Sequence, residues 1–358
     1  MDVLHITEAC GAGVRRHLGL ILPALRSRGI ACGLFAFGSR FEDGFIDEFS
    51  GIGLEDVLFQ QDGASRVVSM LKAAKQIRRL CREWRPRVIH CHAFSAGLAA
   101  RMAAPRGTRL LYSPHAFSVN RRIAFPKRCI AAISEHILRG RTDGYVLVGP
   151  GELEDAASIG IPDSRIHCVF NGLPESIWDE MLAQDAVRAA LGIPKDVKAV
   201  VAPCRLEAQK GLPQLITAWR GISGNATLYI FGEGTMRREL EAQITANSLA
   251  GRVFLHGVQP NLHRFLRAFD AGVLPSLYEG LSYSLLEMLA AGIPVVASDI
   301  PANRIDNGIC FFQLGDGDSL SAAIRNAISV GTRKATFPYA LERQVDALVE
   351  LYASVDRE

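Results

Sequence analysis

The chain has 358 residues, of which 49% are hydrophobic and 22% charged, and it carries a formal net charge of +3. Two domains are expected because this length exceeds what one hydrophobic core usually fills. The composition excludes a disordered or repetitive protein. No segment approaches the roughly 18 apolar residues of a membrane-spanning helix, and the first residues lack the pattern of a signal peptide, so we expect a cytoplasmic protein.

The first half of the chain alternates short β-branched segments with amphipathic segments. Strands are predicted at 3–7, 31–38, 87–93, 108–116, 144–149 and 166–172. Helices are predicted between them at 14–28, 66–84, 95–103, 123–140 and 151–159. Strands separated by helices of this length pair in parallel through right-handed crossovers. A doubly wound α/β domain is therefore expected over residues 1–172.

Basic residues concentrate in this half of the chain. The segment 72–141 contains sixteen Lys and Arg residues and two acids, Glu83 and Glu135. Such a surface favours an anionic partner, while a solvated arginine-rich surface explains it equally well. We expect no nucleic-acid partner.

The alternation stops after Asn171 and resumes near residue 197. Residues 173–196 are predicted to be a linker with a short helix. A second doubly wound domain is predicted over 197–335, with strands at 197–203, 226–232, 252–257, 270–276, 294–299 and 309–312. The last segment, 336–358, is predicted to form a helix over 339–355 that packs back on the first domain.

Ligands of open α/β sheets bind beyond the carboxyl ends of the strands, so the residues after each strand are candidates for a site. After the first strand, Gly11 and Gly13 precede a helix, and small residues there let free N–H groups face an anion. The spacing lacks the third glycine of the dinucleotide fingerprint, so a nicotinamide cofactor is not indicated. A tight turn without a ligand explains this loop as well as a phosphate contact does.

Histidines occupy the ends of two predicted strands. His115 ends the fourth strand, where a side chain points into the crevice, so a functional and a structural role are equally supported. His90 and His92 resemble a metal motif, but alternation along a strand places both on one face and Cys91 on the other. We interpret His90 and His92 as structural. The eight cysteines also show no spacing typical of a zinc site.

In the second half, cations follow the first strand and glycines follow the second. Arg205 and Lys210 lie five positions apart on a loop, a pattern that suits a diphosphate, although two solvated surface cations fit equally well. Gly232 and Gly234 lie at the next strand end, where either close approach to a ligand or an ordinary turn explains them. Neither pattern alone decides between a ligand site and a surface loop.

The stretch YEGLSYSLLEMLAAG, residues 278–292, is the most informative one. A helix is predicted to begin between Ser282 and Ser284. Ser284 and Glu287 fit a capping box, which would give Glu287 a structural role, whereas Glu279 has no such explanation. Two carboxylates at a helix N-terminus could each bind the hydroxyls of one sugar while the helix dipole and the cations bind phosphates, as a nucleotide sugar requires.

Together these residues resemble the pattern of the retaining glycosyltransferases of family 4, whose GT-B fold has two Rossmann-like domains facing each other across a cleft. The resemblance covers nearly the whole chain, from the glycine loop through HCHAFSAGLAARMAA, VFNGLP and RLEAQKG to the E-x7-E glutamates and the final helix. It implies transfer of a sugar from a UDP- or GDP-sugar to an acceptor hydroxyl with retention of the anomeric configuration. It also implies a front-face displacement, in which the departing phosphate assists deprotonation of the acceptor.

The resemblance implies a role for each charged candidate. Glu279 would bind hydroxyls of the donor sugar, and Glu287 would bind the ribose. Arg205 and Lys210 would neutralise the diphosphate, so that neither a metal nor another cofactor is needed. His115 would lie beside the donor sugar and the reacting carbon.

The loops would complete the site. Donor binding would involve the loop residues Gly280, Leu281, Ser282, Gly232 and Gly234. The loop of Gly11 and Gly13 would border the acceptor and a phosphate. Two departures from the family pattern leave the acceptor undefined: Ala12 interrupts the usual Gly-Gly pair, and the segment IPANRIDNGICFF is abbreviated.

We therefore expect a metal-independent glycosyltransferase that uses a nucleotide-sugar donor and a carbohydrate or lipid-linked acceptor in surface polysaccharide or glycolipid assembly. The basic segment 72–141 would dock on the anionic inner face of the cell membrane. One alternative is a sugar-nucleotide epimerase of the same general fold, which would need no acceptor. Another is a non-catalytic nucleotide-sugar-binding subunit, which would keep Arg205 and Lys210 but never turn over.

Overall fold

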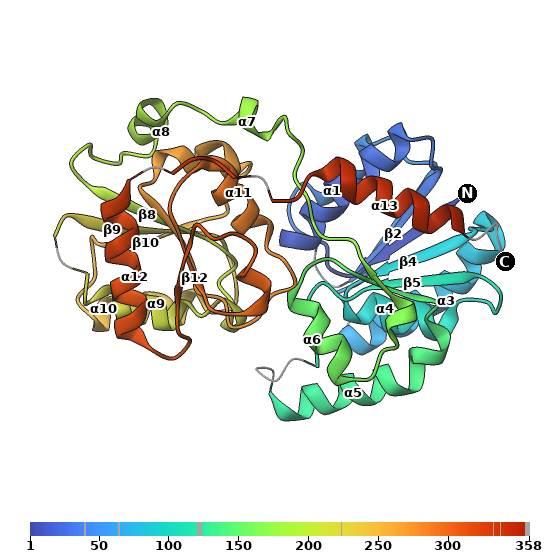
Figure 1. Ribbon diagram of the computed structural model, residues 1–358. Coiled ribbons are helices and arrows are strands. Elements are labelled where there is room, and N and C mark those ends of the chain that lie inside the picture. Colours follow the sequence, from blue (N-terminus) through green and yellow to red (C-terminus); the bar gives the residue numbers. More distant parts are fainter. Residues whose placement is uncertain are drawn as a thin grey trace. The chain divides into compact units, whose positions relative to one another are not determined.

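The computed structural model describes residues 1–38, 41–63, 65–119, 124–222, 224–331, 333–336 and 338–354. The chain forms two compact units (Figure 1). The first consists of Met1–Gly172 together with Tyr339–Glu358, and the second of Leu173–Pro338. Each unit contains a parallel sheet flanked by helices, so the predicted pair of doubly wound α/β domains is confirmed.

Within the described residues, the sheet of the first unit has seven strands in the order β3-β2-β1-β4-β5-β6-β7. These strands are β1 (Val3–Thr7), β2 (Cys32–Gly38), β3 (Asp56–Gln61), β4 (Val88–His92), β5 (Arg109–Ser113), β6 (Gly144–Leu147) and β7 (Ile166–Cys168). The central strands β1 and β4 are buried along their whole length. This burial is typical of a parallel sheet that carries helices on both faces.

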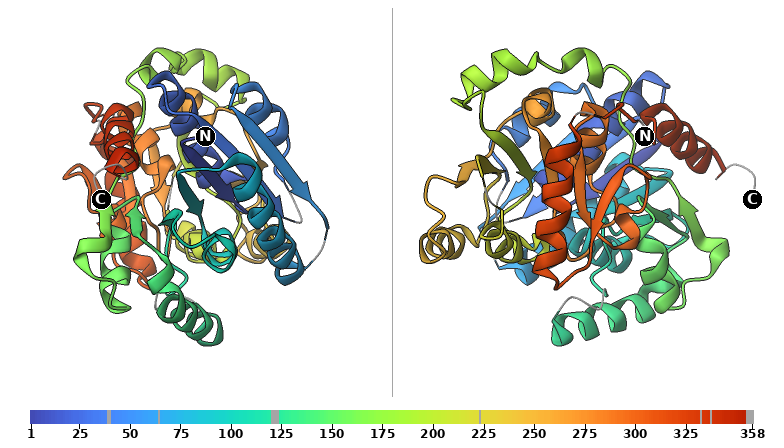
Figure 2. Two further views of the ribbon diagram at one scale, coloured as in Figure 1. Left: turned by 90° about the vertical axis from the view of Figure 1, so that its right-hand side faces the viewer. Right: turned by 60° about the vertical axis from the view of Figure 1, so that its left-hand side comes forward.

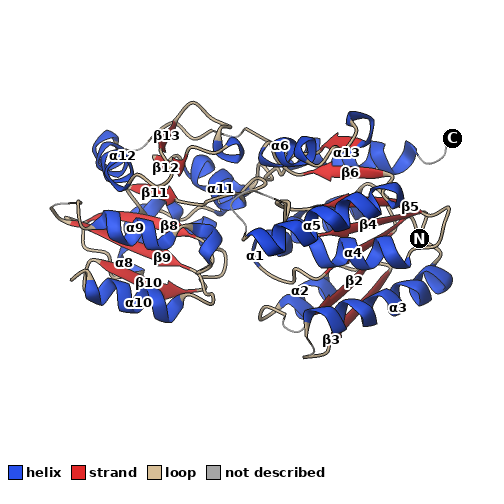
Figure 3. Ribbon diagram, turned by 90° about the horizontal axis from the view of Figure 1, so that it is seen from below, coloured by secondary structure: helices blue, strands red, loops and turns tan. Residues whose placement is uncertain are grey.

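Two groups of helices flank this sheet (Figure 3). One face carries α3 (Arg66–Trp84), α4 (Phe94–Ala103), α5 (Phe125–Leu138) and α6 (Gly151–Ser158). The other face carries α1 (Ala12–Ser27), α2 (Phe45–Gly51) and the C-terminal α13 (Leu341–Ala353). Because α13 contacts α1 and places Leu348 and Tyr352 in the core, the predicted packing of the last helix on the first domain is confirmed.

One α-helix and one strand described in the first unit are absent from the sequence prediction, α2 and β3. Helix α2 has seven residues and buries only Phe45 and Phe49, which is too short a pattern to show helical periodicity. Strand β3 is an edge strand whose residues are half-buried or exposed, so it lacks the continuous apolar run of the central strands. Helix α5 lies at the outer edge of the unit in both views of Figure 2, and only Ala131 and Glu135 of its residues are buried.

The second unit has a parallel sheet of six strands, as far as the structure describes it, in the order β10-β9-β8-β11-β12-β13. The strands are β8 (Lys198–Pro203), β9 (Ala226–Phe231), β10 (Val253–Gly257), β11 (Ala271–Leu274), β12 (Val295–Ser298) and β13 (Ile309–Phe312). Its principal helices are α9 (Leu212–Trp219), α10 (Arg237–Ala246), α11 (Tyr283–Ala291) and α12 (Gly317–Val330). Short 3-10 helices, η3 (Ala208–Lys210), η4 (Leu262–Ala268) and η5 (Pro301–Asn303), complete the loops.

Residues 173–196, predicted as a linker, hold two short helices and pack within the second unit. These helices are α7 (Ile177–Glu180) and α8 (Gln184–Ala190). The indole N–H of Trp178 donates to the Ala290 carbonyl at 3.0 Å, and Arg188 Nη1 donates to the Ala268 carbonyl at 3.1 Å. Both contacts tie this segment to the second sheet and its helices.

Three predictions extend beyond the described part of the chain. The first residue of the predicted helix 123–140 and the last residue of the predicted helix 339–355 lie outside the described residues, as do Arg121 and Arg122 of the basic segment. Among the helices that are described, none has the length and apolar character needed to cross a membrane.

Candidate functional site

Lys210 and Glu279 form an ion pair at the carboxyl end of the second sheet. Lys210 ends η3 in the loop after β8, and Glu279 follows β11. Nζ of Lys210 contacts Oε1 of Glu279, and the two side chains are 12% and 9% exposed. Ser276 Oγ donates to the same oxygen at 2.7 Å, and Gln209 Nε2 donates to the other oxygen at 3.4 Å. The carboxylate is thus fixed in orientation while part of its surface remains open.

Gly211 brings these two loops together. Its φ is +64°, and a Cβ atom there would lie 2.1 Å from the carbonyl oxygen of Pro275. The Leu277 N–H also donates to the Gln209 carbonyl at 2.8 Å. Glycine is required here both for the left-handed backbone and for the close approach. The sequence prediction missed Gly211, although its place directly after Lys210 and before a helix was a usable signal.

Arg205 differs from Lys210 because it is exposed and its side chain forms no hydrogen bond or ion pair with the part of the chain that the structure describes. The preceding Cys204 is buried, and burial raises the pKa of its thiol to about 12. The thiol therefore stays neutral beneath the charged groups and offers no thiolate nucleophile. The exposed guanidinium of Arg205 is left to bind an anion.

The helix that follows Glu279 begins earlier than a capping box would require. Helix α11 starts at Tyr283, and Ser282 is its N-cap, without a capping hydrogen bond from the side chain. Ser284 and Glu287 are then the second and fifth residues of the helix. A capping box joins the N-cap to the third helical residue, so the predicted box between Ser284 and Glu287 is wrong. Glu287 is partly exposed.

The glycines after β9 have a packing explanation. A Cβ atom on Gly232 would lie 2.1 Å from the Cys204 carbonyl oxygen, and one on Gly234 would lie 2.3 Å from that of Leu206. The Leu206 N–H donates to the Glu233 carbonyl at 3.0 Å. These glycines therefore let the turn after β9 pack against the loop that carries Arg205. Of the other predicted loop residues, Gly280 and Leu281 are buried.

A second group of candidates lies in the first unit, where His115 follows β5. His115 and Ala116 have φ values of 52° and 83°, in the left-handed region that such residues seldom adopt. The Glu152 carboxylate holds this backbone, because it accepts from Ala116 N–H at 2.8 Å and from Val148 N–H at 2.6 Å. Backbone strain of this kind persists only where surrounding bonds impose it.

Glu152 itself is fully buried in α6, and burial raises the pKa of its carboxyl group to about 7. The sequence prediction missed Glu152. Its position directly after Gly149, Pro150 and Gly151, at the end of a strand, was the available signal.

Five histidine side chains, including that of His115, lie close together in the first unit. They are His5 of β1, His17 of α1, His90 and His92 of β4, and His115 itself. Nδ1 of His5 lies 3.1 Å from Nε2 of His92, and Nδ1 of His92 lies 3.0 Å from Nε2 of His115. Nδ1 of His90 is hydrogen-bonded to the Tyr352 hydroxyl at 2.7 Å, and Nε2 of His90 is hydrogen-bonded to Ser113 Oγ at 2.9 Å.

The rings of His90 and His92 are 4.3 Å apart between centroids, so their predicted placement on one face of the strand is confirmed. Burial lowers the pKa of His5 to about 3 and that of His17 to about 4. The pKa values of the other three lie well below 6.5 for the same reason. All five imidazoles are therefore neutral. The sequence prediction missed His5 and His17, which the parallel pairing of β1 with β4 and the packing of α1 bring to this place.

The loop of Gly11 and Gly13 faces a carboxylate of the same chain. Gly11 is the N-cap of α1, and the N–H of Ala12 donates to Glu42 Oε2 at 3.3 Å. A Cβ on Gly11 would lie 3.2 Å from the same carboxylate, whereas one on Gly13 would meet no atom within 4 Å. Arg15 also pairs with Glu42, at 3.2 Å. Glu42 thus occupies the position at the helix N-terminus where a phosphate was predicted.

The two doubly wound units have the architecture of GT-B proteins, and solved structures share it over the whole chain. HepE of Anabaena, solved in complex with UDP-glucose, is 16% identical and superposes with a TM-score of 0.81, covering 99% of this chain and 100% of HepE. A glycosyltransferase of Rickettsia africae is 15% identical with a TM-score of 0.77, covering 100% and 99%. The GT-B fold is therefore established for this chain.

Sequence comparisons define the family. Residues 12–172 match the glycosyl transferase 4-like domain, and residues 197–329 match the glycosyl transferases group 1. The lipopolysaccharide core biosynthesis glycosyltransferase LpsE of Rhizobium meliloti is 26% identical over 99% of both chains. The D-inositol 3-phosphate glycosyltransferase of Xylanimonas cellulosilytica is 26% identical over 75% of this chain and 72% of its own. The chain therefore belongs to the glycosyltransferase family, with one matched domain in each unit.

Proposed function

We propose that the protein transfers a sugar from a nucleotide-diphosphate sugar to an acceptor hydroxyl with retention of configuration. The observation that carries this proposal is the Lys210–Glu279 pair, which is held in one orientation before α11, with Lys210 on the same loop as the exposed Arg205. The Glu279 carboxylate contacts a lysine, a serine and a glutamine at once, and a surface loop without a ligand would not require such a network. Such a carboxylate suits a ligand that offers vicinal hydroxyls.

Donor binding would rearrange the ion pair. The diphosphate would bind Arg205 and Lys210, because a guanidinium fork and an ammonium group both favour phosphate oxygens. Lys210 would then share its contacts between phosphate and Glu279, which leaves a carboxylate oxygen to accept from hydroxyls of the sugar. Glu287, on the second turn of α11, would bind the ribose. Backbone N–H groups from Gly280 to Ser282 would complete the donor site.

Transfer would proceed on one face of the sugar. The acceptor oxygen forms a bond to the anomeric carbon as the bond from that carbon to the phosphate oxygen breaks, and the departing phosphate takes the acceptor proton. Arg205 and Lys210 would stabilise the charge that develops on the phosphate, so the reaction as proposed requires no metal. His115 would lie beside the reacting carbon, held by Glu152 through the strained backbone. The loop of Gly11 and Gly13 would border the acceptor, provided that Glu42 moves aside.

Donor binding and turnover together test this proposal. A thermal-shift screen of UDP- and GDP-sugars should raise the unfolding midpoint for the true donor, because a ligand that binds only the folded state stabilises it. Incubation of that donor with a panel of sugar and lipid-linked acceptors should then yield product. Conversion of the donor without an acceptor would favour an epimerase instead. Binding without turnover until a partner chain is added would favour a non-catalytic subunit.

The second part of the proposal is that the first unit docks on an anionic membrane through α5. Phe125, Ile130, Ile133 and Ile137 of this helix are between 59% and 69% exposed. The isoleucines are three and four positions apart, so they form one stripe along the helix. Burying four such side chains is worth up to about 1.5–3 kcal/mol each. An apolar stripe of this size on an edge helix favours an interfacial position.

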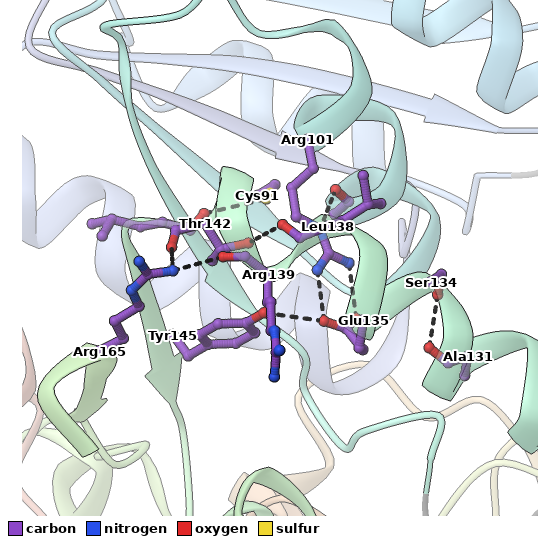
Figure 4. Close-up of polar contacts among 12 residues, drawn as sticks. Cys91, Arg101, Ala131, Ser134, Glu135, Leu138, Arg139, Thr142, Tyr145 and Arg165 are labelled. Carbon is purple, nitrogen blue, oxygen red and sulfur yellow. Dashed lines mark hydrogen bonds and ion pairs between the residues drawn. The ribbon is translucent and has the colours of Figure 1, made fainter. Parts of the chain in front are cut away.

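The basic residues at the ends of α5 favour an anionic bilayer as the surface that covers this stripe. Lys127 and Arg139, at the two ends of α5, are exposed. The single acid of α5, Glu135, is buried, and both its oxygens accept from Arg101 at 2.6 and 2.8 Å (Figure 4). Basic residues near an anionic surface contribute about 1 kcal/mol each. Docking would bring the first unit to a lipid-linked acceptor.

Vesicle flotation tests the docking. The parent protein should float with phosphatidylcholine vesicles that contain phosphatidylglycerol, and less with vesicles that lack it. Ile133→Ser with Ile137→Ser should abolish flotation, whereas Val258→Ser, at an exposed valine of the second unit, should leave it unchanged. Equal flotation with both kinds of vesicle and in both the parent and the double isoleucine variant would contradict the proposal. So would a stable dimer that the double variant dissociates, because a second copy would then cover the stripe.

A further inference from the structure

Three imidazole rings from three elements converge near the carboxyl end of the first sheet. They belong to His17 in α1, His92 at the end of β4 and His115 after β5. One ring nitrogen of each lies within 4.8 Å of those of the other two. Three neutral imidazoles that leave a fourth position open are a known ligand set for zinc. We propose that His17, His92 and His115 form a binding site for a divalent transition-metal ion such as Zn²⁺.

The spacing of the rings agrees with coordination. Zinc binds histidine nitrogen at about 2.0–2.1 Å, so two ligands of a tetrahedral ion are roughly 3.3 Å apart. Nδ1 of His92 and Nε2 of His115 are 3.0 Å apart. The ring centroids of His17 and His115 are 4.7 Å apart. Only small shifts of side chains would separate the first pair and bring the third nitrogen into position.

Hydrogen bonds to residues outside the proposed trio already orient two of the three rings. Nδ1 of His17 is 3.0 Å from Oδ1 of Asn171, and Nε2 of His92 is 3.1 Å from Nδ1 of His5. Ligand histidines in metal sites characteristically use the other ring nitrogen for such a bond, which fixes the ring and its tautomer. His115 is partly exposed, so an ion would enter from its side.

The neighbouring trio of His5, His90 and His92 also satisfies the distance criterion. It is the weaker candidate because both nitrogens of His90 are engaged by residues outside the trio, one by Tyr352 and the other by Ser113, whereas Nδ1 of His92 faces His115 of the proposed site. Coordination through either nitrogen of His90 would break a hydrogen bond to a group outside the trio. His90 therefore serves as the matched control for the proposed site.

Metal binding would inhibit sugar transfer, a consequence that rests on the proposed function. His115 is assigned there to a position beside the donor sugar and the reacting carbon. An ion held by His115 would occupy that position and compete with the donor. The site would thus couple transfer to the availability of a transition metal.

Cobalt titration of the chelator-treated full-length protein tests the site directly. The background is Cys168→Ala, which removes an exposed thiol that could bind metal. One equivalent of Co²⁺ should produce the strong visible absorption of a tetrahedral site, and Zn²⁺ should displace it. His17→Gln and His115→Gln should lose the absorption, and Asn171→Ala should weaken binding about 10- to 100-fold. His90→Gln should bind as the parent does.

Absence of the tetrahedral spectrum in the parent would overturn the proposal. Loss of the spectrum in His90→Gln with retention in His17→Gln would also overturn it, in favour of the other trio. His115 is the partly exposed ligand, so His115→Gln keeps the test decisive if a variant at a buried histidine fails to fold. Because the readout is metal absorption, a positive result stands even if no sugar transfer is found. If zinc binds but sugar transfer is unaffected, the metal site stands and the predicted inhibition of transfer is wrong.

Discussion

Lys210 and Glu279 are 69 positions apart in the chain, yet each is the principal partner of the other. From the sequence, Lys210 is expected to bind a diphosphate and Glu279 is expected to bind a sugar, as separate contacts. Their direct pairing means that a ligand has to be recognised by a preformed unit of both charges. Gly211 is the residue that makes this unit possible, because it alone permits the approach of the Pro275 carbonyl.

Gly211→Ala should therefore damage both stability and donor binding. The left-handed backbone should contribute roughly 1 kcal/mol of destabilisation, and the contact with Pro275 should displace Lys210 from Glu279. The matched control is Gly251→Ala, which has a φ of +80° but meets no atom within 4 Å. Urea unfolding should show a loss in both variants, whereas calorimetry with the donor should show weaker binding only for Gly211→Ala. Equal donor affinity in the two variants would contradict the role given to Gly211.

The buried histidines predict a pH dependence of stability. Their folded pKa values lie below the unfolded value near 6.5, so the unfolded state binds more protons as the pH falls. The free energy of unfolding should therefore be highest near and above pH 6.5, and it should decrease steeply as the pH is lowered below that value. Glu152, with a pKa raised to about 7, acts in the opposite direction, but it is one group against five.

Urea titrations at several pH values, with a chelator present, would measure this dependence. His5→Gln should flatten the slope below pH 6.5, because one imidazole that must stay neutral is removed. His136→Gln, at an exposed histidine of α5, is the matched substitution for comparison. A parent protein whose stability is level between pH 5 and 7 would show that the histidines do not act in this way.

At the level of elements, α5 is attached to α4 by one buried ion pair. Arg101 is fully buried and Glu135 is 3% exposed. Arg101 Nε also donates to the Gly97 carbonyl at 2.9 Å, and Tyr145 OH donates to Glu135 at 3.3 Å (Figure 4). The count of sixteen basic residues in 72–141 therefore overstates the charge at the surface. The exposed apolar stripe, which composition did not reveal, is the stronger feature of this region.

Glu135→Gln should destabilise the protein by about 3–5 kcal/mol, because it leaves the buried guanidinium without its counter-charge. Glu83→Gln is the matched control, since it breaks an exposed ion pair with Arg79 on α3. Exposed pairs of this kind contribute little to stability, because water screens both charges. Chemical denaturation would separate the two cases. A similar small loss in both would mean that α5 does not depend on this bond.

Most elements were predictable because central parallel strands are continuous apolar runs with helices between them. The start of α11 at Tyr283 lies within the predicted range, but its N-cap was not predictable, because Ser282 and Ser284 are both good N-cap residues and only packing selects Ser282. Glu152 and His5 were missed for a different reason. Helix α6 brings Glu152 to the Ala116 backbone, and strand pairing brings His5 to His92, so the residues around one partner do not point to the other.

For the whole molecule, two matched glycosyltransferase domains and a GT-B fold leave the identity of the sugar, base and acceptor to the loops. The central claim is that Glu279 binds the transferred sugar. The direct measurement is the initial rate of transfer by purified Glu279→Gln, beside Glu241→Gln at an exposed acid of α10. We predict a loss of roughly 100-fold or more for Glu279→Gln, with a folded protein and a parental rate for Glu241→Gln. A folded Glu279→Gln variant that transfers sugar at nearly the parental rate would contradict the claim.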